Sequence, residues 1–97
     1  MDKYLYYNEL YDYYKDLLTE KQRQYFEDYY FNNLSLGEIG ENYGVSRNAV
    51  HNQLKIIESK LDEYEKALKL YEKRNKIVDI LTNKIDNKTM ESIKNIL

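Results

Sequence analysis

The sequence predicts an all-α fold, on the strength of three observations. Proline is absent and only three glycines occur among 97 residues, so few positions interrupt a helix. Apolar residues recur at spacings of three and four, the period of a helix with one buried side. Serine or threonine stands just before several of these stretches, where it can cap a helix N-terminus. Together these features predict a single helical domain over residues 1–97.

The first expected helix is rich in tyrosine. Within YLYYNELYDYYKDLL (residues 4–18), apolar side chains fall three and four residues apart on one face. Because this stripe is regular, we interpret its tyrosines as core and interface area rather than as stacking platforms for nucleic-acid bases. The stripe consists of Tyr4, Tyr7, Tyr11, Tyr14 and Leu18, with Leu10 and Leu17 beside it.

The second expected helix covers residues 20–31. Thr19 precedes it as an N-cap, and Gln22 is placed to complete a capping box. The loop FNNL then connects this helix to the next. The expected buried side of the helix consists of Tyr25, Phe26, Tyr29 and Tyr30.

The stretch SLGEIGENYGVSRNAVHNQL (residues 35–54) has the pattern of a helix-turn-helix motif. Ser35 is the expected cap of a short helix over residues 36–43. Gly44 ends that helix, because glycine adopts a left-handed backbone without a Cβ clash. Ser46 then caps a fourth helix two residues later.

The apolar and small residues of this motif stand where its geometry requires them. Ile39 and Val45 are expected where the two helices meet, and Gly40 where their backbones approach most closely. Val50, in the second helix of the motif, is expected to face the core. The next buried position is expected at Leu54 rather than at Gln53.

The fourth helix is expected to be long, reaching roughly Lys73. A heptad seam continues along it at alternating spacings of four and three. Such a helix is longer than a three-helix core can cover. The apolar seam of its C-terminal half must therefore pack against either the C-terminal segment or a second chain. Its length favours self-association as a homodimer. The seam consists of Val50, Leu54, Ile57, Leu61, Tyr64, Leu68 and Tyr71.

The C-terminal segment is expected to form a short helical extension. Its apolar residues are interrupted by a polar break, DNK, at residues 86–88. A short final helix is expected after this break. The apolar positions on the two sides are Ile77, Val78, Ile80, Leu81 and Ile85, then Met90, Ile93, Ile96 and Leu97.

Composition excludes several classes of function. No apolar run reaches the roughly 20 residues that span a bilayer, and the first residues do not resemble a signal peptide. Cysteine is absent and His51 is the one histidine, so we expect neither disulfides nor a metal site. No nucleophile stands with a base and no glycine loop is suited to phosphate, so we expect neither an enzyme nor a cofactor.

Charge gives a weak indication of partners. The net charge is −2, with seven acidic and four basic residues in residues 1–34 but seven acidic and eight basic in residues 61–97. Dedicated nucleic-acid binders usually show a clearly basic face. The charged run EKALKLYEKRNK (residues 65–76) could anchor RNA phosphates, but it has the pattern of the solvated face of an amphipathic helix.

Residues 17–61 resemble region four of bacterial sigma factors. There too a helix like LTEKQRQYFEDYYF precedes a motif like LSLGEIGENYGVS. This sequence departs from the sigma pattern at Gly40, where alanine is usual, and has fewer bases on the recognition helix. With the tyrosine-rich first helix and the extension over residues 62–97, including YEKALKLYEKRNKIVDIL, nearly the whole chain resembles the YlxM family. The resemblance implies a cytoplasmic bacterial protein with a regulatory role in the signal recognition particle pathway.

If the fourth helix enters a major groove, its exposed N-terminal residues meet the base edges. Arginine can bind guanine in bidentate fashion and asparagine can bind adenine. The candidate nucleic-acid-binding residues are Ser46, Arg47, Asn48, His51, Asn52 and Lys55. Few residues can contact phosphates, and the nearby candidates are Lys21, Arg23, Lys55 and Lys60. Glu38 and Glu41 lie on the expected helix over residues 36–43, which would cross the nucleic-acid backbone. A monomer should therefore bind DNA or signal recognition particle RNA weakly.

The alternative hypothesis is a protein adaptor. In this reading the helix-turn-helix is only a scaffold, and the tyrosine stripe or the heptad seam docks a protein such as the signal recognition particle GTPase. An exposed apolar patch at Tyr4, Tyr7 and Tyr11 would support the adaptor.

Overall fold

The all-α prediction is confirmed by the computed structural model, which describes residues 2–97 and contains helices and no strand in that range. The six α-helices are joined by short connections, one of which is a single turn of 3₁₀ helix, η1. In chain order the elements are α1 (Lys3–Tyr14), η1 (Lys15–Leu17), α2 (Glu20–Tyr30), α3 (Leu36–Tyr43), α4 (Arg47–Leu68), α5 (Leu70–Leu81) and α6 (Asn87–Ile96).

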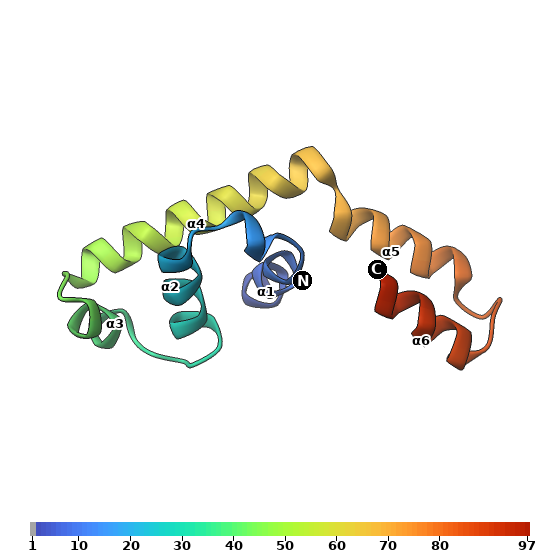
Figure 1. Ribbon diagram of the computed structural model, residues 1–97, viewed down its shortest axis with the longest axis horizontal. Helices are drawn as coiled ribbons and strands as arrows, with labels where there is room; N and C mark the ends of the chain where they lie inside the picture. Colours follow the sequence, from blue (N-terminus) through green and yellow to red (C-terminus); the bar gives the residue numbers. More distant parts are fainter. Residues whose placement is uncertain (1) are drawn as a thin grey trace.

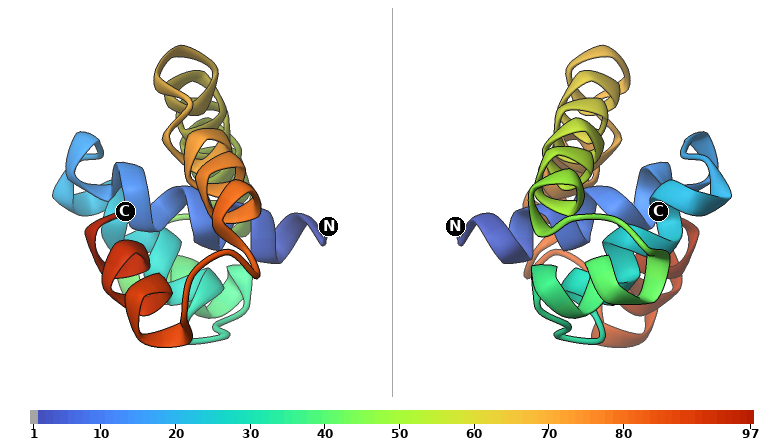
Figure 2. Two further views of the ribbon diagram at one scale, coloured as in Figure 1. Left: turned by 90° about the vertical axis from the view of Figure 1, so that its right-hand side faces the viewer. Right: turned by 90° about the vertical axis from the view of Figure 1, so that its left-hand side faces the viewer.

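The long helix α4 is the spine of an elongated molecule of 52 × 25 × 23 Å. Helices α1, α2 and α3 pack on one side of it, and α5 and α6 form an antiparallel hairpin beyond its C-terminal end (Figure 1). Seen along the long axis, α4 is a ridge above the other helices (Figure 2). The N-terminal end of α4 and the hairpin therefore occupy opposite ends of the molecule.

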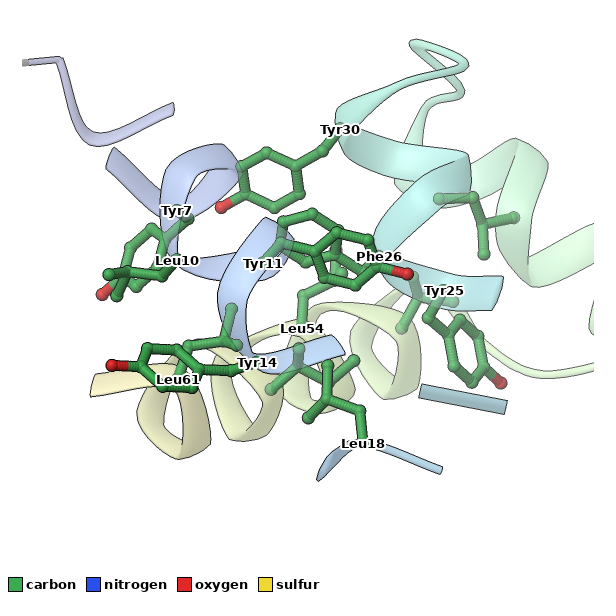
Figure 3. Close-up of a cluster of buried hydrophobic side chains, with 13 residues drawn as sticks. Tyr7, Leu10, Tyr11, Tyr14, Leu18, Tyr25, Phe26, Tyr30, Leu54 and Leu61 are labelled. Atoms are coloured by element: carbon green, nitrogen blue, oxygen red, sulfur yellow. The ribbon is translucent and has the colours of Figure 1, made fainter. Parts of the chain in front are cut away.

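The core lies where α1 and α2 meet α4 (Figure 3). The rings of Tyr11, Phe26 and Tyr30 form a nearly parallel stack with successive centroid separations of 4.2 Å. These contacts join α1 to α2. The buried residues are Tyr7, Leu10, Tyr11, Tyr14, Leu18, Tyr25, Phe26, Tyr30, Ile39, Val50, Leu54, Ile57 and Leu61.

Tyrosine hydroxyls at the edge of this core donate hydrogen bonds to a row of carboxylates on α4. A buried phenol needs a partner for its hydroxyl, and a carboxylate makes a charge-assisted one. The acceptors are spaced four and three residues apart, so they follow the same side of α4. The pairs are Tyr30 with Glu58 at 2.6 Å, Tyr7 with Asp62 at 2.8 Å and Tyr14 with Glu65 at 2.6 Å.

Two further bonds of this kind reach α2. The Tyr11 hydroxyl donates to the Glu27 carboxylate, and the Tyr43 hydroxyl donates to Asp28 at 2.9 Å. The acidic residues that give this chain its negative charge therefore have structural partners in several places.

The prediction that the first helix continues to Leu18 is wrong. Helix α1 ends at Tyr14, and Leu18 has an extended backbone, with φ −94° and ψ 154°. Arg23 stabilises this turn, because its guanidinium donates to the carbonyl oxygens of Leu18 at 2.7 Å and Lys15 at 3.3 Å. The turn still buries Leu18 but leaves Leu17 exposed.

The prediction that the fourth helix reaches Lys73 is also wrong. Helix α4 ends at Leu68, and Lys69 adopts a left-handed conformation with φ 56° before α5 begins. The heptad seam is accordingly buried from Val50 to Leu61 but exposed at Leu68. One residue thus changes the direction of the chain.

The Glu65 side chain explains this break. Its carboxylate accepts hydrogen bonds from the backbone N–H groups of Tyr71 and Glu72, each at 3.1 Å. The Tyr14 hydroxyl accepts another from the N–H of Leu70, also at 3.1 Å. These acceptors cap the first turn of α5 from outside its own sequence, which local capping rules do not anticipate.

The polar break in the C-terminal segment begins earlier than predicted. Helix α5 ends at Leu81, and Asn83 adopts a left-handed conformation with φ 64°. Asp86 is the N-cap of α6, since its carboxylate accepts from the N–H of Thr89 at 2.6 Å. Asn87 and Lys88 therefore belong to the final helix rather than to the break.

Replacing Glu65 with alanine should loosen α5. The substitution removes the acceptor of two N–H groups and of the Tyr14 hydroxyl, so we expect stability to fall by about 1–3 kcal/mol. Hydrogen exchange of the α5 amides should accelerate more than that of the α2 amides. Glu63→Ala is the control, because Glu63 is exposed on the same helix. Equal exchange in the two variants would contradict the capping role.

The fold should lose stability at alkaline pH. Burial, followed by the hydrogen bond and charge of Glu65, raises the pKa of Tyr14 to about 12 from 10.0. Burial and neighbouring carboxylates also raise the pKa of Tyr7, Tyr11 and Tyr30. This stabilisation is complete below the unfolded pKa near 10.0 and is lost as pH rises through the folded values.

Thermal melts and phenolate absorbance recorded across this pH range will test the prediction. Tyr14→Phe should show a smaller loss of melting temperature between pH 10.0 and about 12 than the unaltered chain. An identical pH dependence in both proteins would contradict the assignment.

Candidate nucleic-acid interface

The helix-turn-helix is built from two capped helices and a glycine turn, as predicted. Ser35 and Glu38 form a capping box at the start of α3, with reciprocal bonds of 3.1 and 3.0 Å. Gly44 has φ 68° and lies in the left-handed region. The Ser46 hydroxyl caps α4 by accepting from the N–H of Ala49 at 3.1 Å.

Gly40 lies at the closest approach of the two backbones. Its carbonyl accepts from the N–H of Val45 at 2.9 Å, and a Cβ at this position would lie only 2.6 Å from the Val45 carbonyl oxygen. Alanine, usual here in the sigma pattern, would therefore need a shifted turn.

One apolar position of the motif differs from the prediction. Ile39 is fully buried, but Val45 is 37% exposed. The tight turn carries the Val45 side chain towards solvent, where it borders a hollow of about 290 Å³ with Tyr25 and Ala49. Leu54 is buried and Gln53 exposed, as predicted.

The candidate residues from Arg47 to Lys55 share one exposed face at the N-terminal end of α4. Their spacing of one, three, one and three residues keeps them on the same side of a helix. Within residues 2–97 no hydrogen bond or ion pair engages these side chains, apart from the capping bond of Ser46. The face consists of Arg47, Asn48, His51, Asn52 and Lys55, with Ser46 at its start.

One hollow lies beside this face and a second is lined partly by its residues. The first is the hollow beside Val45, which also includes Lys21 from α2. The second, of about 90 Å³, brings Lys3 from α1 next to His51 and Lys55. Lys3 was not among the candidates, and its position depends on how α1 crosses α4, which the sequence does not specify.

The basic residues near the motif differ in how far they are already engaged within the chain. Arg23 is occupied by the two carbonyls that it holds. Lys21 lies over the Tyr25 ring at 5.8 Å. Lys3 pairs with Glu58 at 3.4 Å and is 70% exposed at its side chain.

Helix α3, the first helix of the helix-turn-helix motif, carries two acidic residues. Glu38 is exposed, and the hydrogen bond that its carboxylate accepts from the backbone N–H of Ser35 lowers its pKa. Glu41 is also exposed. Both reduce the attraction of this end of the molecule for phosphates.

No group of three or more histidine, aspartate or glutamate side chains within residues 2–97 is placed to hold a metal ion. Over the same range, no helix combines the length and the apolar character needed to cross a membrane.

Comparison with known proteins gives one family. The family model of UPF0122, described as a YlxM / p13 like helix-turn-helix protein, matches residues 1–96. A UPF0122 protein of Halalkalibacterium halodurans is 47% identical over 89 residues, covering 89% of this chain and 82% of the relative. One from Shouchella clausii is 52% identical over 73 residues, covering 75% and 67%. One from Geobacillus kaustophilus is 43% identical over 91 residues, covering 91% and 83%.

Gly40→Ala should destabilise the motif. The added Cβ forces the backbone of the turn to move, so we expect a loss of about 1–3 kcal/mol in the free energy of unfolding. Gly37→Ala is the matched control, because the nearest atom to its Cβ would be 3.9 Å away and alanine favours the helix. Chemical denaturation of both variants provides the measurement. Equal stability would show that the turn yields without cost.

Proposed function

We propose that this chain, which belongs to the UPF0122 family of YlxM/p13-like helix-turn-helix proteins, is a regulatory protein that binds nucleic acid. The contacts are made by the N-terminal face of α4. The observation that carries this proposal is a set of polar and basic side chains on one exposed helix face, with their hydrogen-bonding groups unused inside the chain.

The chemistry of this face suits base contacts. Arg47 offers a bidentate donor to guanine, and Asn48 and Asn52 offer the paired donor and acceptor that adenine requires. The N-terminal position of this face on an exposed helix is the one from which a recognition helix contacts bases in the major groove.

Affinity should depend on few phosphate contacts. Lys21 and Lys55 are available near the face, whereas Glu38 and Glu41 oppose an anionic backbone. Binding by one chain should therefore be modest and only moderately dependent on salt. The resemblance to YlxM makes signal recognition particle RNA the first target to compare with duplex DNA.

The adaptor hypothesis names the tyrosine stripe or the heptad seam as the docking surface, and the tyrosine stripe is not exposed. Tyr7 and Tyr11 are buried in the core and Tyr4 is partly buried, so the tyrosine stripe does not form the exposed patch that docking would use. Docking of the signal recognition particle GTPase would have to involve another surface.

Fluorescence anisotropy tests the proposal directly. Labelled signal recognition particle RNA and a random DNA duplex are titrated with the pure protein at low and physiological salt. Arg47→Ala should weaken binding by about 1–3 kcal/mol with an unchanged melting temperature. Lys55→Ala should reduce the slope of affinity against salt by about one unit.

Lys66→Ala is the matched control, because Lys66 is exposed in the last turn of α4, away from the face. Its binding should equal that of the unaltered chain. Equal binding by Arg47→Ala would overturn the site. Failure of both nucleic acids to bind at physiological salt would overturn the function and favour the adaptor.

A further inference from the structure

The C-terminal hairpin encloses a groove against α1. No residue of α5 or α6 is buried, although both helices carry large apolar side chains. A cavity of about 300 Å³ lies between the hairpin and the side chain of Tyr13 on α1. Its apolar lining consists of Tyr13 from α1, Leu70 and Ile77 from α5, and Ile96 and Leu97 from α6.

This lining is poorly covered within one chain. Ile96 is 85% exposed, and Leu70 and Ile77 are also exposed. Ordering a helix costs conformational entropy that burial of its apolar face normally offsets. Exposed apolar side chains gathered around one cavity favour a partner that covers them.

The two sides of the groove carry opposite charge. On the hairpin side, Lys73 and Arg74 line the cavity. On the α1 side, Glu9 lies one helical turn before the cavity residue Tyr13 and Asp12 directly precedes it, and both carboxylates are exposed. We call these the basic wall and the acidic wall.

Tyr13 lies within reach of both walls. Its pKa is raised mainly by burial, with Arg74 acting to lower it and Glu9 and Asp12 acting to raise it. The apolar floor is therefore bounded by opposite charges on its two sides.

We infer that a second copy of this chain docks in this groove, with the acidic wall of each copy against the basic wall of the other. A twofold axis brings the same surface of both copies together, so a surface with two opposite walls complements itself. A different partner that carries acidic and apolar side chains would be attracted by the basic wall alone. The small net charge of −2 also keeps repulsion between copies low.

This dimer does not depend on nucleic-acid binding. The hairpin lies at the opposite end of the long axis from the N-terminal end of α4 (Figure 1). Both α4 faces therefore remain accessible in the dimer, and the two inferences can fail separately.

Sedimentation or light scattering at increasing protein concentration measures the association. The unaltered chain should form a dimer, and Ile96→Asp should raise the dissociation constant by about tenfold or more. The fold should be retained, because Ile96 contributes little to the monomer. Ile56→Asp is the matched control, since Ile56 is exposed on α4 outside the groove.

Charge exchange tests the pairing of the walls. Glu9→Lys/Asp12→Lys and Lys73→Glu/Arg74→Glu should each be monomeric alone, because each places like charges together. An equimolar mixture should form a heterodimer, since every acidic wall again faces a basic one. Circular dichroism verifies that both variants fold.

Three outcomes would overturn the inference. These are a monomeric unaltered chain at all concentrations, a dimer insensitive to Ile96→Asp, or charge variants that fail to associate on mixing. The first would leave the groove to a different partner, and the others would place the dimer interface elsewhere.

Discussion

The arrangement of this molecule depends on the phenol–carboxylate bonds along α4. Tyr7 and Tyr14 come from α1 and Tyr30 comes from α2, so one row of acceptors fixes both helices on the same spine. Each ring fills the core while its hydroxyl reaches the edge, which lets a large aromatic side chain be buried without an unsatisfied polar group. The same row extends to α5, because Glu65 serves a tyrosine and the next helix together.

This arrangement changes how the acidic composition should be understood. Glu58, Asp62 and Glu65 are required by the packing of the N-terminal helices, and Glu27 and Asp28 have similar roles on α2. A net charge of −2 is therefore partly a property of how the core is closed. The negative net charge is therefore only weak evidence against nucleic-acid binding, because the exposed side chains in the first turns of α4 are neutral or basic.

Features set by neighbouring residues could be predicted from the sequence, and features set by distant ones could not. The caps at Thr19, Ser35 and Ser46 and the turn at Gly44 depend on local backbone geometry and were predicted. The ends of α1 and α4 depend on Arg23 and Glu65, which act across the fold. The shared face of the candidate residues follows from helical spacing. The position of Lys3 beside His51 and Lys55 could not be predicted, because it depends on how α1 crosses α4.

Lys69, the single left-handed residue between α4 and α5, is a position at which one substitution can change the shape of the molecule. Asparagine or glycine at position 69 adopts that conformation at low cost and preserves the arch, whereas a β-branched residue resists it. Fusion of the two helices would produce a rod of about 50 Å. Descendants of one ancestor could thus diverge between bent and straight forms through one codon, while the helix-turn-helix at the other end stays unaltered.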